Sequence, residues 1–171
     1  MKTLKMNTMI RLAAISLVAV LSSCASWRSV DVAALQTESE VTTRLGNPTH
    51  VYQDGATHLL EYMHGRRAQA THMVRVAADG KVISYEQVLT EQKFAEIKLG
   101  VSDKAAVLKI LGAPYEHVYY SRVGLEAWSY PYKESGVWNS LMAVYFDQDG
   151  IVRKLENGPD PVFEPREHRR F

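Results

Sequence analysis

The sequence predicts an α+β protein made of two tandem repeats, in each of which short helices pack on an antiparallel β-meander. Internal similarity is the first reason. Leu45-Gly46-Asn47-Pro48 returns as Leu111-Gly112-Ala113-Pro114, at an offset of 66, and Asp79-Gly80-Lys81-Val82 returns as Asp149-Gly150-Ile151-Val152, at an offset of 70. The second reason is that the hydrophobic period changes from helical to alternating after each Gly-x-Pro. Helix first and strands afterwards, twice over, is an α+β pattern.

Two shorter matches lie between these segments. His50-Val51-Tyr52 returns as His117-Val118-Tyr119, at an offset of 67, and Tyr62 returns as Tyr130, at an offset of 68. Repeats of this length favour a duplicated small domain over a solenoid, whose units are usually shorter. The chain is therefore divided into a leader (1–23), a lead-in (24–36), a first repeat (37–89), a second repeat (90–158) and a flexible, proline-containing tail (159–171).

Capping residues predict three helices. Thr37-Glu38-Ser39-Glu40 is a capping box, in which the threonine hydroxyl and Glu40 each accept a backbone N–H. Gly46 and Gly112 stand where a residue of positive φ ends a helix. In the second repeat we expect Ser102 to be the N-cap, after an additional helix over 90–99.

Alternating apolar residues predict four strands in each repeat, with Asp-Gly pairs at the turns. The expected strands are 50–52, 59–63, 73–76 and 82–88 in the first repeat, and 116–121, 126–131, 140–147 and 151–157 in the second.

The first 24 residues predict export and a lipid anchor. Three basic residues precede the apolar run 12–21, which is too short to cross a bilayer comfortably. Leu21-Ser22-Ser23-Cys24 resembles the lipobox of bacterial lipoproteins, and Cys24 is the only cysteine. That resemblance implies acyl chains, palmitate included, on Cys24, and Ala25 in place of aspartate implies the outer membrane, facing the periplasm. The alternative is an ordinary secreted protein with one stray cysteine.

Composition limits the possible functions. Without the three basic residues of the leader, 17 Lys and Arg remain against 19 Asp and Glu, a net charge of about −2. A nucleic-acid-binding protein would carry a basic patch instead. No catalytic constellation or phosphate loop occurs, so we expect no enzyme and no cofactor beyond the covalent lipid. A metal site at His58, His64 and His72 is conceivable, but we expect exposed strand histidines.

Two sets of residues are candidates for partner binding. Trp128 and Tyr130 share one face of the 126–131 strand, and we expect this face to be the one that helices leave uncovered. Tyrosine and tryptophan are enriched in interface hot spots, although these rings could instead fill a core. Arg66 and Arg67 lie in a loop and could meet an anionic partner or lipopolysaccharide, or be a solvated pair.

A helix ending in Leu-Gly-x-Pro, strands with a central aromatic and then Asp-Gly-x-Val, on a lipoprotein, resemble the SmpA/OmlA/BamE family over 37–89 and 90–158. The resemblance implies a fold related to the repeats of β-lactamase inhibitory protein. It also implies a protein-binding scaffold or accessory subunit in outer-membrane assembly or envelope maintenance, with envelope proteins, including β-barrel assembly components, as partners. The alternative is an inhibitor-type module that docks a periplasmic enzyme.

Overall fold

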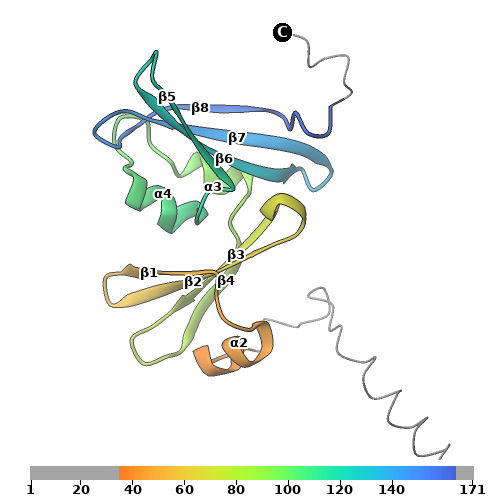
Figure 1. The fold of residues 1–171 in the computed structure, drawn as a ribbon. Helices are drawn as coiled ribbons and strands as arrows, with labels where there is room; N and C mark the ends of the chain where they lie inside the picture. Colours follow the sequence, from red (N-terminus) through yellow and green to blue (C-terminus); the bar gives the residue numbers. More distant parts are fainter. Residues whose placement is uncertain (1–34, 165–171) are drawn as a thin grey trace, which may run out of the picture. The chain divides into compact units, whose positions relative to one another are not determined.

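Two four-stranded antiparallel sheets, the first preceded by one short helix and the second by two, are the main elements of the computed structural model, which describes residues 35–164 (Figure 1). The predicted α+β class is confirmed. Leader residues 1–23 and Cys24 lie outside the described residues. The elements are α2 (Glu38–Leu45), β1 (His50–Asp54), β2 (Thr57–His64), η3 (Arg66–Ala68), β3 (Ala70–Val76), β4 (Val82–Gln87), α3 (Glu91–Ala95), α4 (Lys104–Leu111), β5 (Glu116–Tyr120), β6 (Leu125–Glu134), β7 (Trp138–Phe146) and β8 (Val152–Pro159).

Both sheets have the same strand order, β1-β2-β3-β4 in residues 37–89 (the first half) and β5-β6-β7-β8 in residues 90–158 (the second half). Their irregularities also correspond. The pairing register shifts between Arg75 and Val76 in β3, and between Tyr145 and Phe146 in β7. These two places are separated by the same offset as the two Asp-Gly-x-Val segments. A bulge bends its strand, so the two sheets bend at corresponding positions.

The first strands of the two sheets correspond at a slightly different offset from the predicted one. His50 pairs with Glu61, while Glu116 pairs with Ser129. Since Glu61 and Ser129 occupy matching places in β2 and β6, His50 corresponds to Glu116. The predicted match between His50-Val51-Tyr52 and His117-Val118-Tyr119 is therefore wrong by one residue, and a one-residue slip moves every side chain to the other face.

The helix ends follow the predicted capping chemistry with one exception. The capping box at Thr37 is present, and Gly46 and Gly112 have φ values of 83° and 81°, as predicted. The N-cap of α4 is Asp103 rather than Ser102: its side chain accepts the N–H of Ala106. The Ser102 hydroxyl is already engaged by the N–H of Lys98.

The core of the second half lies between β6–β8 and the helices α3 and α4. Each sheet strand contributes alternate residues to it, which is typical of a sheet with one covered face. Its buried members are Leu89, Phe94, Ile97, Val107, Leu111, Trp128, Tyr130, Tyr132, Met142, Val144, Phe146 and Val152.

The first sheet is covered on both faces. On one face, Tyr62 donates from its hydroxyl to the carbonyl of Gly46 after α2, and His58 contacts Glu38 of that helix. The opposite face carries Leu59 and Met73, which are buried although α2 lies on the other side. Residues of the second half, chiefly on α4, cover this opposite face.

The second half extends past the predicted boundary at 158. β8 ends at Pro159, and the side chain of Asp160 is fully buried. The Asp160 N–H donates to the carbonyl of Asn139 at 2.9 Å. The start of the predicted flexible tail is therefore part of the fold; residues 165–171 lie outside the described part of the chain.

Candidate partner-binding surfaces

Helix α4 has apolar residues on two sides, because it packs on both sheets. Val107 and Leu111 are fully buried in the core of the second half. Ala106 and Ile110, on the other side, line a cleft whose remaining walls include Leu59 and Met73 of the first sheet. The second half thus supplies the cover that the first sheet needs.

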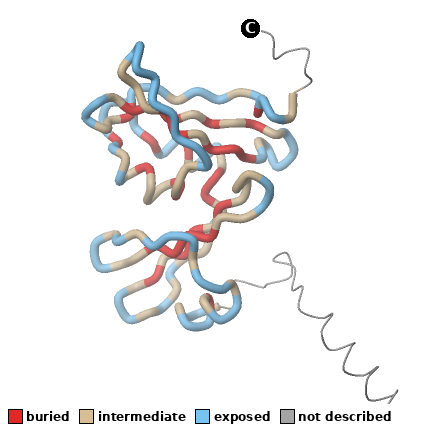
Figure 2. The backbone as a smooth tube through the Cα atoms, in the orientation of Figure 1, coloured by how far each residue is buried: buried red, intermediate tan, exposed pale blue. Residues whose placement is uncertain are grey.

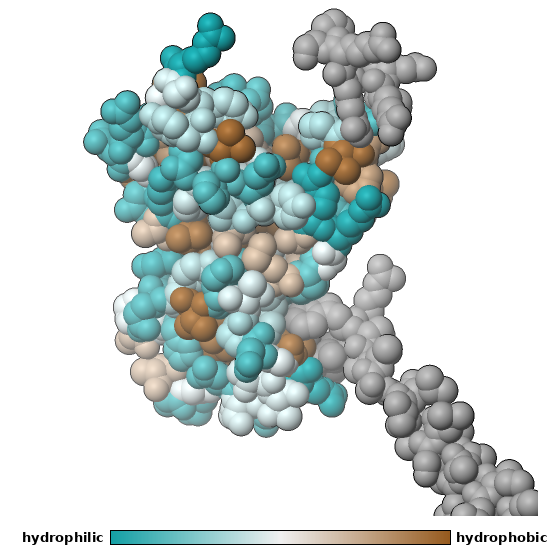
Figure 3. Space-filling model, in the orientation of Figure 1, coloured by the Kyte–Doolittle hydropathy of each residue, from teal (hydrophilic) through white to brown (hydrophobic). Residues whose placement is uncertain are grey.

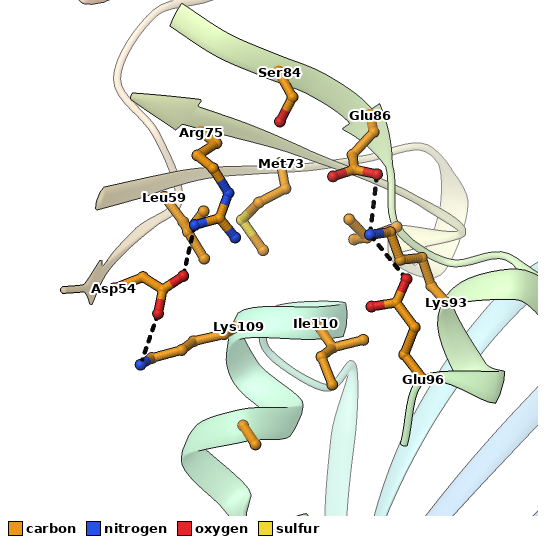
Figure 4. Close-up of a pocket in the computed structure, with 12 residues that line it drawn as sticks. Asp54, Leu59, Met73, Arg75, Ser84, Glu86, Lys93, Glu96, Lys109 and Ile110 are labelled. Atoms are coloured by element: carbon orange, nitrogen blue, oxygen red, sulfur yellow. Dashed lines mark hydrogen bonds and ion pairs between the residues drawn. The ribbon is translucent and has the colours of Figure 1, made fainter. Parts of the chain in front are cut away.

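This cleft has a volume of about 250 Å³ and is bordered by ion pairs (Figure 4). Asp54 in β1 contacts Arg75 at 2.6 Å and Lys109 of α4 at 3.1 Å. Hydrogen bonds from Arg75 and then Lys109 hold the pKa of the Asp54 carboxyl below its usual range. Asp54 therefore stays ionised and bridges the two halves.

A second set of ion pairs lies at the other end of the cleft. Lys93 contacts Glu86 at 3.1 Å and Glu96 at 3.2 Å. Burial lowers the pKa of Lys93, but the two carboxylates outweigh it and raise the pKa overall. Three carboxylates and three cations line the cleft and pair with one another, so it presents no excess charge that would select an ionic ligand.

A buried polar contact between the halves involves Glu61. Its side chain has no exposed surface, and its Oε1 accepts the N–H of Ala113 at 2.9 Å. The hydroxyl of Tyr52 donates to Oε2 at 2.6 Å, and Nδ1 of His50 lies 3.0 Å from the same oxygen. Burial raises the pKa of Glu61, against the opposing effect of these hydrogen bonds. A buried carboxylate with several partners fixes the relative position of the groups that bind it.

Trp128 and Tyr130 do not lie on an uncovered face. Their exposed fractions are 8% and 1%, and both belong to the core beneath α4. The Tyr130 hydroxyl donates to the carbonyl of Gly112 at 3.2 Å, as Tyr62 does to Gly46. The predicted placement was wrong because this face of β6 is the one that the helices cover.

Arg66 and Arg67 lie in η3 and contact the second half. The guanidinium of Arg67 lies over the ring of Tyr115, 4.8 Å from its centroid, and Nε is 3.6 Å from Asp160 Oδ2. Arg66 is exposed, and its guanidinium lies 5.2 Å from the ring centroid of Phe163. Arg67 is thus committed to contacts within the chain, and a solvated pair does not describe it.

The three histidines occupy one face of the first sheet. The rings of His64 and His72 stack with centroids 4.6 Å apart, and His58 pairs with Glu38. All three are partly buried, so the expectation of exposed strand histidines was wrong. Within residues 35–164 no group of three or more His, Cys, Asp or Glu could hold a metal ion.

The face of the second sheet opposite α3 and α4 has no helix over it among the described residues. We call it the outer face. Tyr120 and Tyr145 lie on it with ring centroids 6.4 Å apart, and the Tyr145 hydroxyl donates to Glu156 at 2.8 Å. By register, the residues that β5, β6 and β7 contribute are Glu116, Val118, Tyr120, Leu125, Ala127, Ser129, Pro131, Lys133, Asn139, Leu141, Ala143 and Tyr145.

Strand β5 borders this face and is exposed along its whole length (Figure 2). The exposed fractions of Val118, Tyr119 and Tyr120 are 39%, 57% and 47%. Elsewhere, hydrophobic residues on the face seen in Figure 3 form separate small patches among polar ones. The strand predicted over 116–121 is therefore confirmed as β5, but its residues were not among the predicted partner-binding candidates, although the run Val-Tyr-Tyr was a usable signal.

One comparison with known proteins matches most of the second half. Residues 86–156 match the model of a family described as the outer membrane protein assembly factor BamE domain. The predicted BamE-like resemblance is confirmed for this part of the chain, which runs from β4 into β8.

Other comparisons add little. A solved structure of a DUF4309 family protein (YjgB) from Bacillus subtilis subsp. subtilis str. 168 is 16% identical, with 72% of this chain and 78% of that chain covered and a TM-score of 0.31. Likeness at that level supports no argument about function. No curated protein matches the chain. No helix within 35–164 is long and apolar enough to span a membrane.

Proposed function

We propose that this protein is a lipid-anchored, periplasm-facing accessory subunit that binds other envelope proteins during outer-membrane assembly. The observation that carries the proposal is the BamE domain match over residues 86–156, since that family is described as an assembly factor. The lipobox-like segment ending in Cys24 supports the anchor. Two acyl chains give stable membrane attachment where one is marginal. The protein's part is to bind and position, without a catalytic step.

The outer face of the second sheet is the proposed docking site. Its centre contains the partly exposed Ala143 beside the larger Leu141 and Tyr145, so a partner can approach the sheet closely there, while neighbouring Ala127 is buried. Tyrosine supplies a large contact area at small entropic cost. The outer face replaces Trp128 and Tyr130 as the candidate docking site, because those two rings are buried in the core.

We also propose that the two halves are duplicated copies with different tasks. The corresponding face of the first sheet contacts the second half within the chain through Glu61, whereas the matching residue of β6 is Ser129, on the outer face. A buried glutamate needs partners, and a serine tolerates water. This difference supports a first copy that holds the second copy, and a second copy that meets the partner.

Partner capture tests the docking site. The full chain carrying Ala143→Glu is used to capture proteins from detergent-solubilised membranes, beside Val137→Glu, which places the same charge in an exposed turn. A buried unpaired charge opposes docking, so Ala143→Glu should capture at least tenfold less of a β-barrel assembly component. The variant should keep a cooperative melting transition, at a slightly lower temperature because Ala143 lies opposite Glu156. Equal capture by the two variants would reject this face. Capture of a soluble periplasmic enzyme alone would favour the inhibitor-type module.

Metabolic labelling with an acyl probe tests the anchor separately. We expect label on the wild-type chain and none on Cys24→Ser, because no other cysteine is present. Undiminished label on the variant would contradict the proposed lipid attachment.

A further inference from the structure

The two sheets have four edge strands, and two of these are visibly protected against pairing. An exposed edge invites another strand unless bulges, charges or proline discourage it. The pairing of β4 with β3 shifts register at Arg75/Val76, and the pairing of β8 with β7 shifts register at Tyr145/Phe146. β8 also carries Arg153, Lys154 and Glu156 and ends at a proline.

A third edge, β1, is engaged by contacts within the chain. Asp54 pairs with Lys109 of α4, while Tyr52 and His50 bind the carboxylate of Glu61. His50, Tyr52 and Asp54 are thus held to the first sheet and to α4.

β5 lacks these protections. It pairs with β6 in unbroken register from Glu116 to Tyr120, with no proline and with every residue exposed. An exposed, regular and largely apolar edge strand is a template for strand addition.

We propose that β5 pairs antiparallel with β5 of a second copy of this chain, about a two-fold axis at Val118. In this register Val118 lies opposite Val118 of the partner, His117 opposite Tyr119, and Glu116 opposite Tyr120. Apolar, aromatic and polar residues then meet without like charges opposite one another, as cross-strand pairing favours. The two-fold axis makes the surface self-complementary, which a closed dimer requires.

The chain already contains the Glu–Tyr contact that this pairing repeats. Tyr52 donates to Glu61 on the neighbouring strand at 2.6 Å, and Tyr145 donates to Glu156 on the neighbouring strand at 2.8 Å. Glu116, Val118 and Tyr120 all lie on the outer face, so pairing joins the outer faces of both copies on the same side of one continuous sheet.

The interface is small, since each copy contributes one five-residue strand. Small interfaces belong to the weak, transient class. We therefore expect a dissociation constant of about 10 µM to 1 mM in solution. Confinement to a membrane surface raises the effective concentration and favours the dimer there.

Disulfide trapping tests the pairing. The full chain carrying Cys24→Ser, so that the introduced thiol is the sole one, receives Val118→Cys and is oxidised mildly in detergent. Two matched controls, Val51→Cys in β1 and Val123→Cys in the turn after β5, are more exposed, at 57% and 67% against 39%. Random collisions would cross-link the controls faster, whereas the proposed axis brings the two Val118 positions together.

We expect Val118→Cys to form covalent dimers at least tenfold faster than either control. A rate equal to or below that of the controls would overturn the proposal. So would oxidation in a detergent extract of membranes that cross-links Val118→Cys exclusively to a different protein, because a strand of that protein would then occupy the edge.

Sedimentation of a second variant checks the pairing without cysteines. In the otherwise wild-type full chain, Tyr119→Pro should weaken self-association at least tenfold while keeping a cooperative melting transition, because proline is tolerated in an edge strand but blocks pairing there. Self-association that is unchanged in a folded Tyr119→Pro chain would refute the dimer. Capture of barrel-assembly components by the same variant is scored independently, so loss of the dimer and loss of the proposed function are distinguishable.

Discussion

The carboxylate of Glu61 in the first sheet packs against Gly112 at the end of α4. A Cβ atom on Gly112 would lie 2.7 Å from the carboxyl carbon of Glu61, so the missing side chain admits the carboxylate. The next N–H, of Ala113, then donates to Glu61 at 2.9 Å. At the matching position in the first half, Gly46 has open space around its Cβ position. Gly112 therefore serves both the helix end and the contact between the halves.

Alanine substitution separates these two roles. Gly46 and Gly112 share nearly the same backbone, with φ of 83° and 81° and ψ of −168° and −167°, a conformation essentially limited to glycine. The backbone strain should thus be equal in both variants. Gly112→Ala should lose about 1–3 kcal/mol more unfolding free energy than Gly46→Ala, because it also displaces Glu61 from a buried hydrogen bond. Urea denaturation measures the difference, and equal losses would contradict the role of Glu61.

Aromatic truncations should distinguish the core from the outer face. Trp128→Ala and Tyr130→Ala each empty a buried site and should lower the unfolding free energy by about 3–5 kcal/mol. Tyr145→Ala on the outer face should cost far less and leave a cooperative transition. Thermal melting of the three variants decides this. Melting of Trp128→Ala at the wild-type temperature would be incompatible with a core that contains this ring.

The ion pair across the cleft should contribute little to stability. The side chains of Asp54 and Lys109 are 34% and 39% exposed, so water and salt screen their attraction. Lys109→Met should change the unfolding free energy by at most about 1 kcal/mol. Urea denaturation at low and at high salt tests this, and a loss of several kcal/mol would show that the cleft is much drier than its exposure indicates.

Acid should destabilise the protein through His72. Burial, followed by the charge of neighbouring His64, lowers the pKa of His72 from 6.5 to about 4. Between these values the unfolded chain binds the proton and the folded chain does not. The contribution of neutral His72 to the unfolding free energy is therefore complete above pH 6.5. It is lost as the pH falls towards 4, by up to about 3 kcal/mol.

Unfolding free energies measured from pH 7 to pH 4 test the titration of His72. His72→Gln should flatten the decline, whereas His117→Gln, at an exposed position in β5, should not. Parallel declines in the wild type and His72→Gln would assign the acid sensitivity to other groups.

Residues that begin and end helices made much of the fold predictable. Gly46, Gly112 and the Thr37 capping box act through local backbone geometry, so their roles follow from neighbours in the sequence. The α4 N-cap was misplaced by one residue because both Ser102 and Asp103 can cap. Only the tertiary structure shows that the Ser102 hydroxyl is engaged by Lys98.

The candidate site was much less predictable, because alternation reveals two faces of a strand but not which one is covered. In β6, Trp128 and Tyr130 looked suitable for either role, and the core contains them. The contact between the halves had a weak signal in Glu61, a lone carboxylate within the apolar run Leu59–Met63. Its partner, the N–H of Ala113, is far away in the sequence. It is a backbone group, so the residue type does not reveal it.

The position of α4 between the two sheets has a consequence for biogenesis. Because synthesis proceeds from the N-terminus, the first sheet is made before the helix that covers Leu59 and Met73. Until Ala113 follows, this sheet has an apolar surface in contact with water, and Glu61 lacks its main-chain donor. A chaperone that binds apolar surfaces would therefore act on the first half, and α4 would displace it when the second half folds.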